Sequence, residues 1–598
     1  MRFSPLDQIN TKNVQNLKPA WTYHLKPAEA ATTPKVPSGT PNYRSRPRSS
    51  EATPIVVDGT MYLPTPYGTV VALDPETGKE LWTFKLDKGR PSTRGVGYWP
   101  GDKETPAAII FGTTDGRMMS LNAKTGKLSS GFGENGVVDL KPGIGNGLPE
   151  VRYGVSSPPT IYKNIVILGA QLQESPELGP AGDIRAWDAH DGKLLWQFHT
   201  VPHPGEMGND TWPEGSWKNR SGANVWGLTS FDAKRGLIFL PIGSATYDYY
   251  GGDRTGKNLF SNSLVAIHAE TGKLAWYFQA VHHDITDYDL ESAPLLMDVT
   301  HKGEKIPAVA IMSKTGLMFI LDRRDGKPIY GVEERPVPPS EIEGEHRWPT
   351  EPFPVKPQPL ARNSFDPSEL ATVTPEQEKF CKTMMATEDG LVGSGPFSAF
   401  GKKLTVLFPG TIGASSWPGM SYDPQLGYLF VNISNLADVG RIKNFGPGAD
   451  PPYQRTSPWG IYNRFWNEEK YWPCQKPPWG ELWAINANTG EVAWKIPFGT
   501  IPELDAAGVH NTGSLNYGGS IATAGGLLFI GATNDRFFHA YDAATGKLLW
   551  QQKLDAGSYV VPITYKGKSG KQYVLTLATG GSFYDRKSGD AVIAFALP

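Results

Sequence analysis

Short apolar segments alternate with polar turns along almost the whole chain, and one version of this pattern recurs. In most copies an apolar strand leads to an Asp or Asn, a T-G-K or D-G-K turn and a second strand, usually with Trp. The copies read VVALDPETGKELWTFKL, MMSLNAKTGKLSSGFG, RAWDAHDGKLLWQFHT, LVAIHAETGKLAWYFQ, MFILDRRDGKPIYGV, LWAINANTGEVAWKIPFG and FHAYDAATGKLLWQQKL. The flanking segments show the period of two of strands, and the glycine supplies the positive φ of a tight turn. The repeat therefore predicts a long series of β-hairpins.

Hairpins that recur at intervals of tens of residues indicate a propeller or a linear array. The N-terminal NLKPAWTYHL and the C-terminal DAVIAFALP are strands without a partner next to them in the sequence. Pairing them would close a ring and leave no free edge. We therefore predict an all-β fold, an eight-bladed β-propeller of four-stranded antiparallel blades, as one domain over residues 1–598. The largest insertions are expected at about 330–400, Pro-rich and mostly irregular, and at 436–480.

Composition and charge exclude several classes of function. The net charge is −2 without a basic run, which argues against a nucleic-acid partner. No apolar run reaches the length of about 18 residues of a membrane helix, and the first ten residues lack a signal-peptide core, so we expect a mature chain. The absence of C-x-x-C-H and of G-x-G-x-x-G argues against covalent haem and nicotinamide. Cys381 and Cys474 are either a disulfide or two thiols.

The stretch AVHHDITDYDLES, residues 280–292, places two histidines and three aspartates where a predicted strand ends. Such a cluster is either a solvated loop or half of an active site. On an extended chain Asp289 faces the same way as Asp287. For His282, His283 and Asp284 we expect a solvated loop.

The repeat, together with TAGGLLFIGATNDRFFHAYDAATGKLLW and RGVGYWP, resembles the pyrroloquinoline quinone (PQQ) dehydrogenases over essentially the whole chain. SPLDQINTKNVQNLKPAW, VHHDITDYD, SKTG and CQKPPWG are most similar to the periplasmic part of membrane-bound glucose dehydrogenase, whose membrane helices are absent here. The resemblance implies a periplasmic, PQQ- and metal-dependent dehydrogenase that oxidises an alcohol or polyol hydroxyl. Electrons would pass to an external cytochrome c or quinone.

The resemblance assigns Asp287 as the catalytic base and Lys314, in SKTG, as the cation directed at the quinone oxygens. A carboxylate near a cation stays ionised and can take the hydroxyl proton as hydride leaves carbon. The implied metal is Ca²⁺, which prefers oxygen ligands. A lanthanide is the alternative, because an aspartate at the Asp289 position accompanies it in some methanol-type relatives. The implied metal ligands are Glu174, Asp287, Ser244 and Asp289, with Ser244 in place of the methanol-type Asn.

The implied cofactor site needs a flat platform and cations. Trp226 stands at the platform position, and Arg94 at that of a carboxylate-binding arginine with bidentate geometry. Arg90 lies near a glucose-type histidine and either stacks on the quinone or is solvated. The full set of implied cofactor contacts is Glu51, Arg90, Arg94, Ser156, Thr246, Trp226 and Lys314.

The insertion RIKNFGPGADPPYQRTSPWGIYNRFWNEEKYWPC is rich in aromatic residues, and we expect it to form a lid over the quinone. Such a lid favours a cyclic secondary alcohol as substrate, with glucose or another sugar as the alternative. A reading from another class is a non-catalytic propeller, like the outer-membrane assembly scaffolds with similar Trp repeats. A scaffold needs no metal carboxylate, no platform Trp and no quinone Lys.

Overall fold

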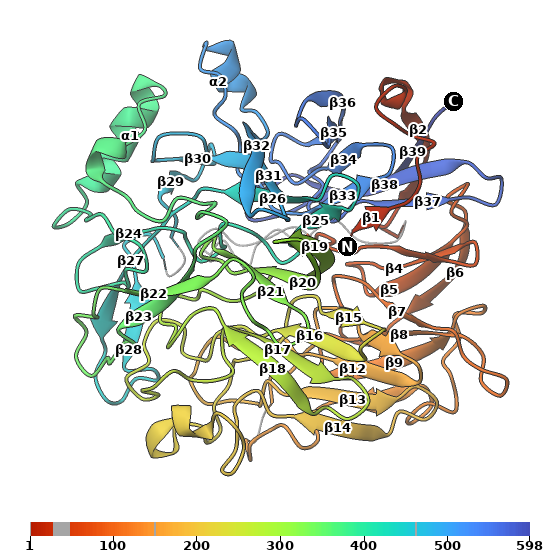
Figure 1. The fold of residues 1–598 in the computed structure, drawn as a ribbon, viewed down its shortest axis with the longest axis horizontal. Helices are drawn as coiled ribbons and strands as arrows, with labels where there is room; N and C mark the ends of the chain where they lie inside the picture. Colours follow the sequence, from red (N-terminus) through yellow and green to blue (C-terminus); the bar gives the residue numbers. More distant parts are fainter. Residues whose placement is uncertain (1, 28–47, 149–150, 461–462) are drawn as a thin grey trace.

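The computed structural model describes residues 2–27, 48–148, 151–460 and 463–598, which are almost entirely β-strands and loops (Figure 1). Antiparallel sheets follow one another round the molecule, from red and orange on the right of Figure 1, through yellow below, to green and blue. The first sheets contain β3 (Ile55–Val57), β4 (Thr60–Pro64), β5 (Thr69–Leu73) and β6 (Glu80–Lys85); β7 (Gly97–Trp99), β8 (Ala108–Gly112), β9 (Arg117–Asn122) and β10 (Val137–Asp139); and β11 (Thr160–Tyr162), β12 (Ile165–Leu168), β13 (Ile184–Asp188) and β14 (Leu194–Phe198). The all-β prediction is confirmed.

The later sheets follow the same order, with two departures. They contain β15 (Ser230–Asp232), β16 (Leu237–Pro241), β17 (Ser263–His268) and β18 (Leu274–Gln279); β19 (Leu295–His301), β20 (Glu304–Met312) and β21 (Met318–Asp322); β25 (Ser421–Asp423), β26 (Tyr428–Ser434), β31 (Gly480–Asn486) and β32 (Glu491–Pro497); and β33 (Ser520–Thr523), β34 (Leu527–Ile530), β35 (Phe537–Asp542) and β36 (Leu548–Lys553). The sheet of β19 has three strands rather than the expected four. The short β1 (Phe3–Ser4) adds a parallel fifth strand beside β33.

The two ends of the chain meet in one sheet. β2 (Lys18–His24) pairs antiparallel with β39 (Ser588–Ala596), which continues through β38 (Gln572–Gly580) to β37 (Ile563–Lys566). This is the pairing expected from the two unpartnered terminal segments. The number of blades in a closed ring stays a prediction.

Tryptophans of the repeat join several sheets to the next one. Trp494 donates its indole N–H to the carbonyl of Ala543, 3.1 Å away, in the turn of the following sheet. A Cβ on Gly546 would lie 2.8 Å from the ring of the same Trp494, and the φ of Gly546 is +73°. The turn glycine is therefore required twice, for the left-handed backbone and for the close approach of the indole. Where the fifth sheet lacks the Trp, Tyr330 donates instead to Ala487 O.

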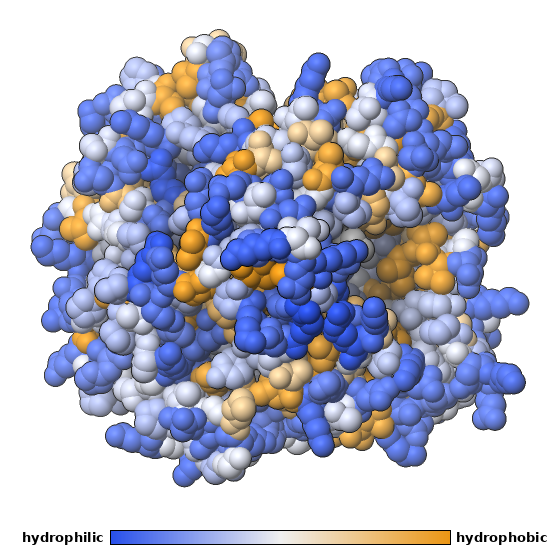
Figure 2. All heavy atoms as spheres, viewed as in Figure 1, coloured by the Kyte–Doolittle hydropathy of each residue, from blue (hydrophilic) through white to orange (hydrophobic). Residues whose placement is uncertain are grey.

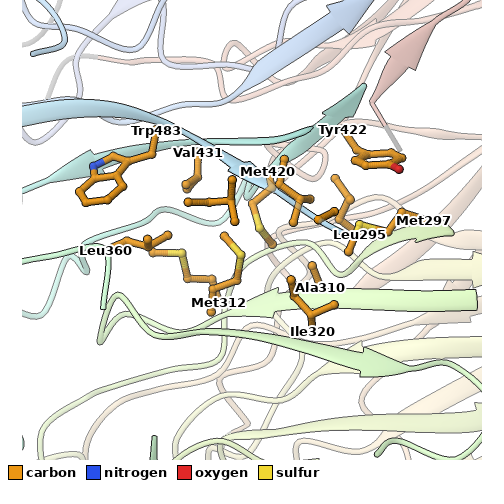
Figure 3. Close-up of a cluster of buried hydrophobic side chains, with 14 of the residues drawn as sticks. Leu295, Met297, Ala310, Met312, Ile320, Leu360, Met420, Tyr422, Val431 and Trp483 are labelled. Atoms are coloured by element: carbon orange, nitrogen blue, oxygen red, sulfur yellow. The ribbon is translucent and has the colours of Figure 1, made fainter. Parts of the chain in front are cut away.

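Apolar side chains from neighbouring sheets interlock between them (Figure 3). In the cluster drawn, one side comes from β19–β21 and the other from β25, β26 and β31. Its labelled members are Leu295, Met297, Ala310, Met312, Ile320, Leu360, Met420, Tyr422, Val431 and Trp483. The surface in Figure 2 is mostly hydrophilic, with scattered hydrophobic patches. Burial between sheets, at about 25 cal/mol per Å² of apolar surface, holds the arrangement together.

The insertions carry the remaining elements. They are β22 (Val332–Pro336), β23 (Thr350–Pro354), β24 (Thr405–Leu407), β27 (Asp438–Asn444), β28 (Tyr453–Thr456), β29 (Trp466–Asn467), β30 (Trp472–Pro473), α1 (Pro375–Met385), α2 (Pro502–Ala506) and the 3₁₀ turns η1 (Val14–Asn16), η3 (Asn209–Thr211), η4 (Pro213–Gly215) and η5 (Pro367–Glu369). The insertion at 330–400 is thus more regular than expected, since it contains the β22–β23 hairpin and α1. Within 436–480, residues 461 and 462 lie outside the described part.

Cys381 of α1 forms a disulfide with Cys474, 93 residues later, which decides the alternative that the sequence left open. The bond joins the two insertions to each other. No helix in the described ranges is both long enough and apolar enough to span a membrane.

Candidate active site

The site residues lie in two kinds of connection between strands. One kind links the last strand of a sheet to the first strand of the next, as around Asp287 between β18 and β19. The other links the second strand to the third, as around Lys314 between β20 and β21. Because successive strands are antiparallel, both kinds of connection emerge on the same face of the molecule. The fold therefore gathers residues from distant repeats on one face.

The segment 280–292 is buried, and the expectation of a solvated loop for His282, His283 and Asp284 is wrong. Their exposed fractions are 5%, 0% and 2%. Asp284 accepts hydrogen bonds from Ser244 Oγ at 2.5 Å and from the Tyr288 backbone N–H at 2.7 Å. These bonds fix the backbone around the predicted base.

The insertion at 330–400 covers these buried residues. His283 Nε2 lies 2.7 Å from Glu345 Oε1, and the His282 N–H donates to Glu351 Oε2 at 2.8 Å. Despite burial, His283 and the Gly251 N–H lower the pKa of Glu345. Because this cover is some 60 residues away in sequence, the local pattern gave no sign of it.

Asp287, Asp289 and Lys314 form a buried charged triad. Lys314 Nζ lies 2.6 Å from Asp287 Oδ1 and 2.9 Å from Asp289 Oδ2. Asp287 has a left-handed backbone, with φ of +59°, which few non-glycine residues adopt. The Lys314 N–H donates to the Asp289 carbonyl at 3.0 Å, so the backbones of the two connections are joined as well. The two predicted catalytic residues are thus in direct contact.

Burial and charge shift the triad in opposite directions. Burial raises the pKa of Asp287 well above that of a free aspartate, and Lys314 opposes this. Burial alone would favour a neutral amine, but Asp287 and Asp289 raise the pKa of Lys314 above its usual value. Burial also acts against ionised Asp289, yet Lys314 and the Ser244 N–H, at 2.6 Å, lower the pKa of Asp289. Lys314 is therefore a cation that holds two carboxylates.

Trp226 connects this triad to the predicted cofactor contacts. Its indole N–H donates to Asp289 Oδ2 at 3.2 Å. The Arg94 guanidinium carbon lies 4.9 Å from the Trp226 ring centroid and 4.6 Å from that of Trp417. Glu51 Oε2 lies 3.0 Å from Arg94 Nε, and Ser156 Oγ accepts from Arg94 Nη1 at 3.1 Å. Four predicted residues, Glu51, Arg94, Ser156 and Trp226, are thus in one connected group.

The predicted metal ligands are only partly brought together. Ser244 contacts Asp289 and Asp284, while the Thr246 hydroxyl donates to the Glu177 carbonyl at 2.6 Å. Glu174 is exposed but close enough to act on the pKa of Asp287. In the described part of the chain no three His, Cys, Asp or Glu side chains are arranged to hold a metal ion. The ligand set therefore stays a prediction.

Arg90 lies apart from this group. It is exposed, and its backbone pairs with Thr114 through bonds of 3.1 and 2.9 Å. Among the described residues it takes part in no ion pair and no ring contact, and whether it stacks on the quinone stays a prediction.

Sequence reasoning missed three buried residues here. Trp417 provides the second indole beside Arg94. Asp248 is 5% exposed, and burial together with Glu174 and Asp289 raises its pKa well above the usual value. Glu291 is 3% exposed, and burial raises its pKa to about 8. Only Glu291 had a local signal, the period of two in D-Y-D-L-E.

Comparison with known proteins identifies relatives of the whole chain. A family model described as PQQ, glucose/ethanol/alcohol dehydrogenase, beta-propeller domain, matches residues 1–574. Quinoprotein glucose dehydrogenase A of Acinetobacter calcoaceticus is 33% identical over 100% of this chain and 78% of its own length. Quinate/shikimate dehydrogenase (quinone) of Acinetobacter baylyi is 33% identical over 100% of this chain and 77% of its own. The crystal structure of quinohemoprotein alcohol dehydrogenase from Comamonas testosteroni has the same fold, with a TM-score of 0.70 at 24% identity, covering 100% of this chain and 78% of that one.

Proposed function

This chain belongs to the family of PQQ-dependent (quinoprotein) dehydrogenases, and we propose that it oxidises a cyclic secondary alcohol to the ketone. An oxidoreductase acting on CH–OH groups is the activity of the family. The observation that carries the proposal is the contact of 2.6 Å between Asp287 and Lys314 beside Trp226. We further propose a periplasmic location, Ca²⁺ as the metal, and an external cytochrome c or quinone as electron acceptor.

The residues present fit PQQ. A planar quinone with three carboxylates requires a flat aromatic surface and cations, and Trp226, Arg94 and Lys314 supply these within one connected group. Glu291 Oε1 is buried without a hydrogen-bond partner among the described residues, as expected where a ligand completes the site. When bound, PQQ supplies an ortho-quinone that accepts a hydride equivalent from the substrate carbon. The support for Ca²⁺ is that carboxylate oxygens are the donors it prefers, and no step of the proposed reaction depends on the metal.

The substrate hydroxyl proton is taken by Asp287. Lys314 binds Oδ1, whereas the one contact of Oδ2 among the described residues is a long one of 3.5 Å with the Tyr249 hydroxyl, so Oδ2 is the oxygen that can accept the proton. A buried carboxylate with a raised pKa is a stronger base than a solvated one. Lys314 stabilises negative charge that develops nearby, and Asp289 keeps the lysine in place.

Aromatic side chains support a cyclic, weakly polar substrate. Trp226 packs against a buried cluster that draws members from the insertion at 436–480, including Trp466, Trp472 and Trp479. Aromatic surroundings of this kind favour the apolar face of a ring over an open polyol chain. One relative is named for quinate and shikimate, which are cyclic secondary alcohols, and another for glucose, which remains the alternative substrate.

The activity is tested by dye-linked oxidation with metal-free apo-protein, with and without PQQ and Ca²⁺. Activity is expected only with PQQ and Ca²⁺ together, and Asp287→Ala should reduce kcat by about 10²–10⁴-fold, the range of a lost general base. The same panel compares cyclic secondary alcohols, glucose and glycerol. A panel in which glucose reacts best would reject the cyclic-alcohol proposal. Absence of both PQQ binding and turnover would reject the proposal of an enzyme and favour the non-catalytic propeller scaffold.

A further inference from the structure

Glu291 continues the row of carboxylates that begins at Asp287. Residues 287, 289 and 291 place a carboxylate at every second position of the connection between β18 and β19. Lys314 Nζ lies 2.6 Å from Asp287 and 2.9 Å from Asp289, and Glu291 also raises the pKa of Lys314. Glu291 also lies within electrostatic reach of Arg94 and Glu51. Glu291 therefore belongs to the same group of buried charges as the Asp287–Asp289–Lys314 triad and Arg94.

The backbone of Glu291 is packed against the aromatic platform. A Cβ on Gly227, the residue after Trp226, would lie 2.5 Å from the Glu291 carbonyl oxygen. Two residues further on, the Ala293 N–H donates to the Trp417 carbonyl at 3.2 Å. The segment thus runs between the two tryptophans whose rings flank Arg94, and its position is fixed at both ends.

The carboxyl oxygen Oε1 of Glu291 has no hydrogen-bond partner in the described ranges, although it is fully buried. It lies beside Gly413, where an added Cβ would be 3.1 Å from Oε1 and 2.7 Å from Lys314 Cγ. A buried polar atom left unpaired costs about 1–3 kcal/mol. Such an unpaired atom, buried beside Lys314, is what a ligand-binding group looks like before the ligand arrives.

We propose that Glu291 is a further cofactor-binding residue, whose Oε1 atom forms a hydrogen bond with a polar atom of the bound quinone between Arg94 and Lys314. This inference rests on the proposed function, because it concerns the same site. It adds a residue to the cofactor contacts that the sequence resemblance implies.

The test measures PQQ affinity rather than turnover. Apo-protein with Ca²⁺ is titrated with PQQ, and binding is followed by quenching of tryptophan fluorescence. Glu291→Leu should weaken the Kd by about 10-fold or more, the effect of one lost hydrogen bond to a charged or buried group. Glu291→Gln keeps a polar atom in place and should stay within about threefold of wild type.

A matched control is Glu351→Gln. Glu351 is also a fully buried glutamate whose Oε1 has no hydrogen-bond partner in the described ranges, although Arg347 lies 3.9 Å away. It belongs to the cover of the histidines, and its substitution should leave the PQQ affinity unchanged. If Glu291→Leu does not fold, as judged by its melting curve, Glu291→Asp replaces it and should show the same direction of loss. Wild-type affinity in the folded Leu or Asp variant would overturn the inference alone. A wild-type protein that binds no PQQ would overturn the proposed function, and the inference with it.

Discussion

Replacing Lys314 with Met tests whether its ammonium holds the two aspartates in the folded state. The substitution leaves Asp287 and Asp289, whose side chains are 12% exposed, facing each other without the cation that lies 2.6 and 2.9 Å from them. Breaking a buried ion pair by removing one partner costs about 3–5 kcal/mol. We therefore expect Lys314→Met to be substantially less stable than wild type.

The size of the effect follows from the length of the chain. At about 2.1 cal/mol/K per residue, cooperative unfolding of 598 residues has an entropy of about 1.3 kcal/mol/K. The expected loss thus lowers Tm by roughly 2–4 °C. The assay is differential scanning calorimetry of PQQ-free protein in chelator, so that no bound cation replaces the ammonium.

Two further variants make the result specific. Adding Asp289→Asn to Lys314→Met removes one of the facing charges and should recover part of the lost Tm. Lys305→Met is the matched control, because Lys305 pairs with Asp298 at 3.3 Å on the surface, where ion pairs contribute little. A Lys314→Met protein that melts at the wild-type temperature, or that melts lower still after Asp289→Asn, would refute the buried-pair argument.

Other substitutions test the fold and the cover of the site. Gly546→Ala forces a side chain into a left-handed turn and against Trp494, and calorimetry should show a loss of about 1–3 kcal/mol; an unchanged Tm would contradict the packing account. Replacing Cys381 and Cys474 by Ala opens a loop of 93 residues and should cost up to about 4–5 kcal/mol, whereas equal melting with and without reductant would show that the bond is not needed. Glu345→Gln should remove stability that wild type has at neutral pH, because the pKa of Glu345 is lowered in the folded state. The contribution of Glu345 to stability is present above the pKa of a free glutamate and disappears as the pH falls through the folded pKa. Melting curves of the two proteins should therefore converge in acid, and a constant difference across pH would contradict this.

Resemblance in sequence selected residues that the fold brings into contact, while their roles stay predictions. Glu51, Arg94, Ser156 and Trp226 are bonded or stacked in one group, as a shared cofactor site requires. Arg90 was selected by its nearness in sequence to a family position, and its side chain stays exposed. A position in an alignment identifies a connection between strands, but the direction of a long side chain depends on what packs beside it.

Glu291 shows the opposite case, a residue with a local signal that was not used. D-Y-D-L-E places a third carboxylate two residues after Asp289, so a further charged residue in this connection was predictable from spacing. Its burial and its missing partner were not predictable, because they depend on Trp226 and Gly413.

The sequence by itself determined the repeated hairpins and the strand ends at which the candidate site residues lie. These follow from local causes, namely the alternation of apolar residues and the φ of turn glycines. Only the tertiary structure decided which charged side chains are buried and which residues they pair with. His283 is covered by Glu345, and Lys314 lies between Asp287 and Asp289, because desolvation and Coulomb attraction act between residues that the fold, not the sequence order, makes neighbours.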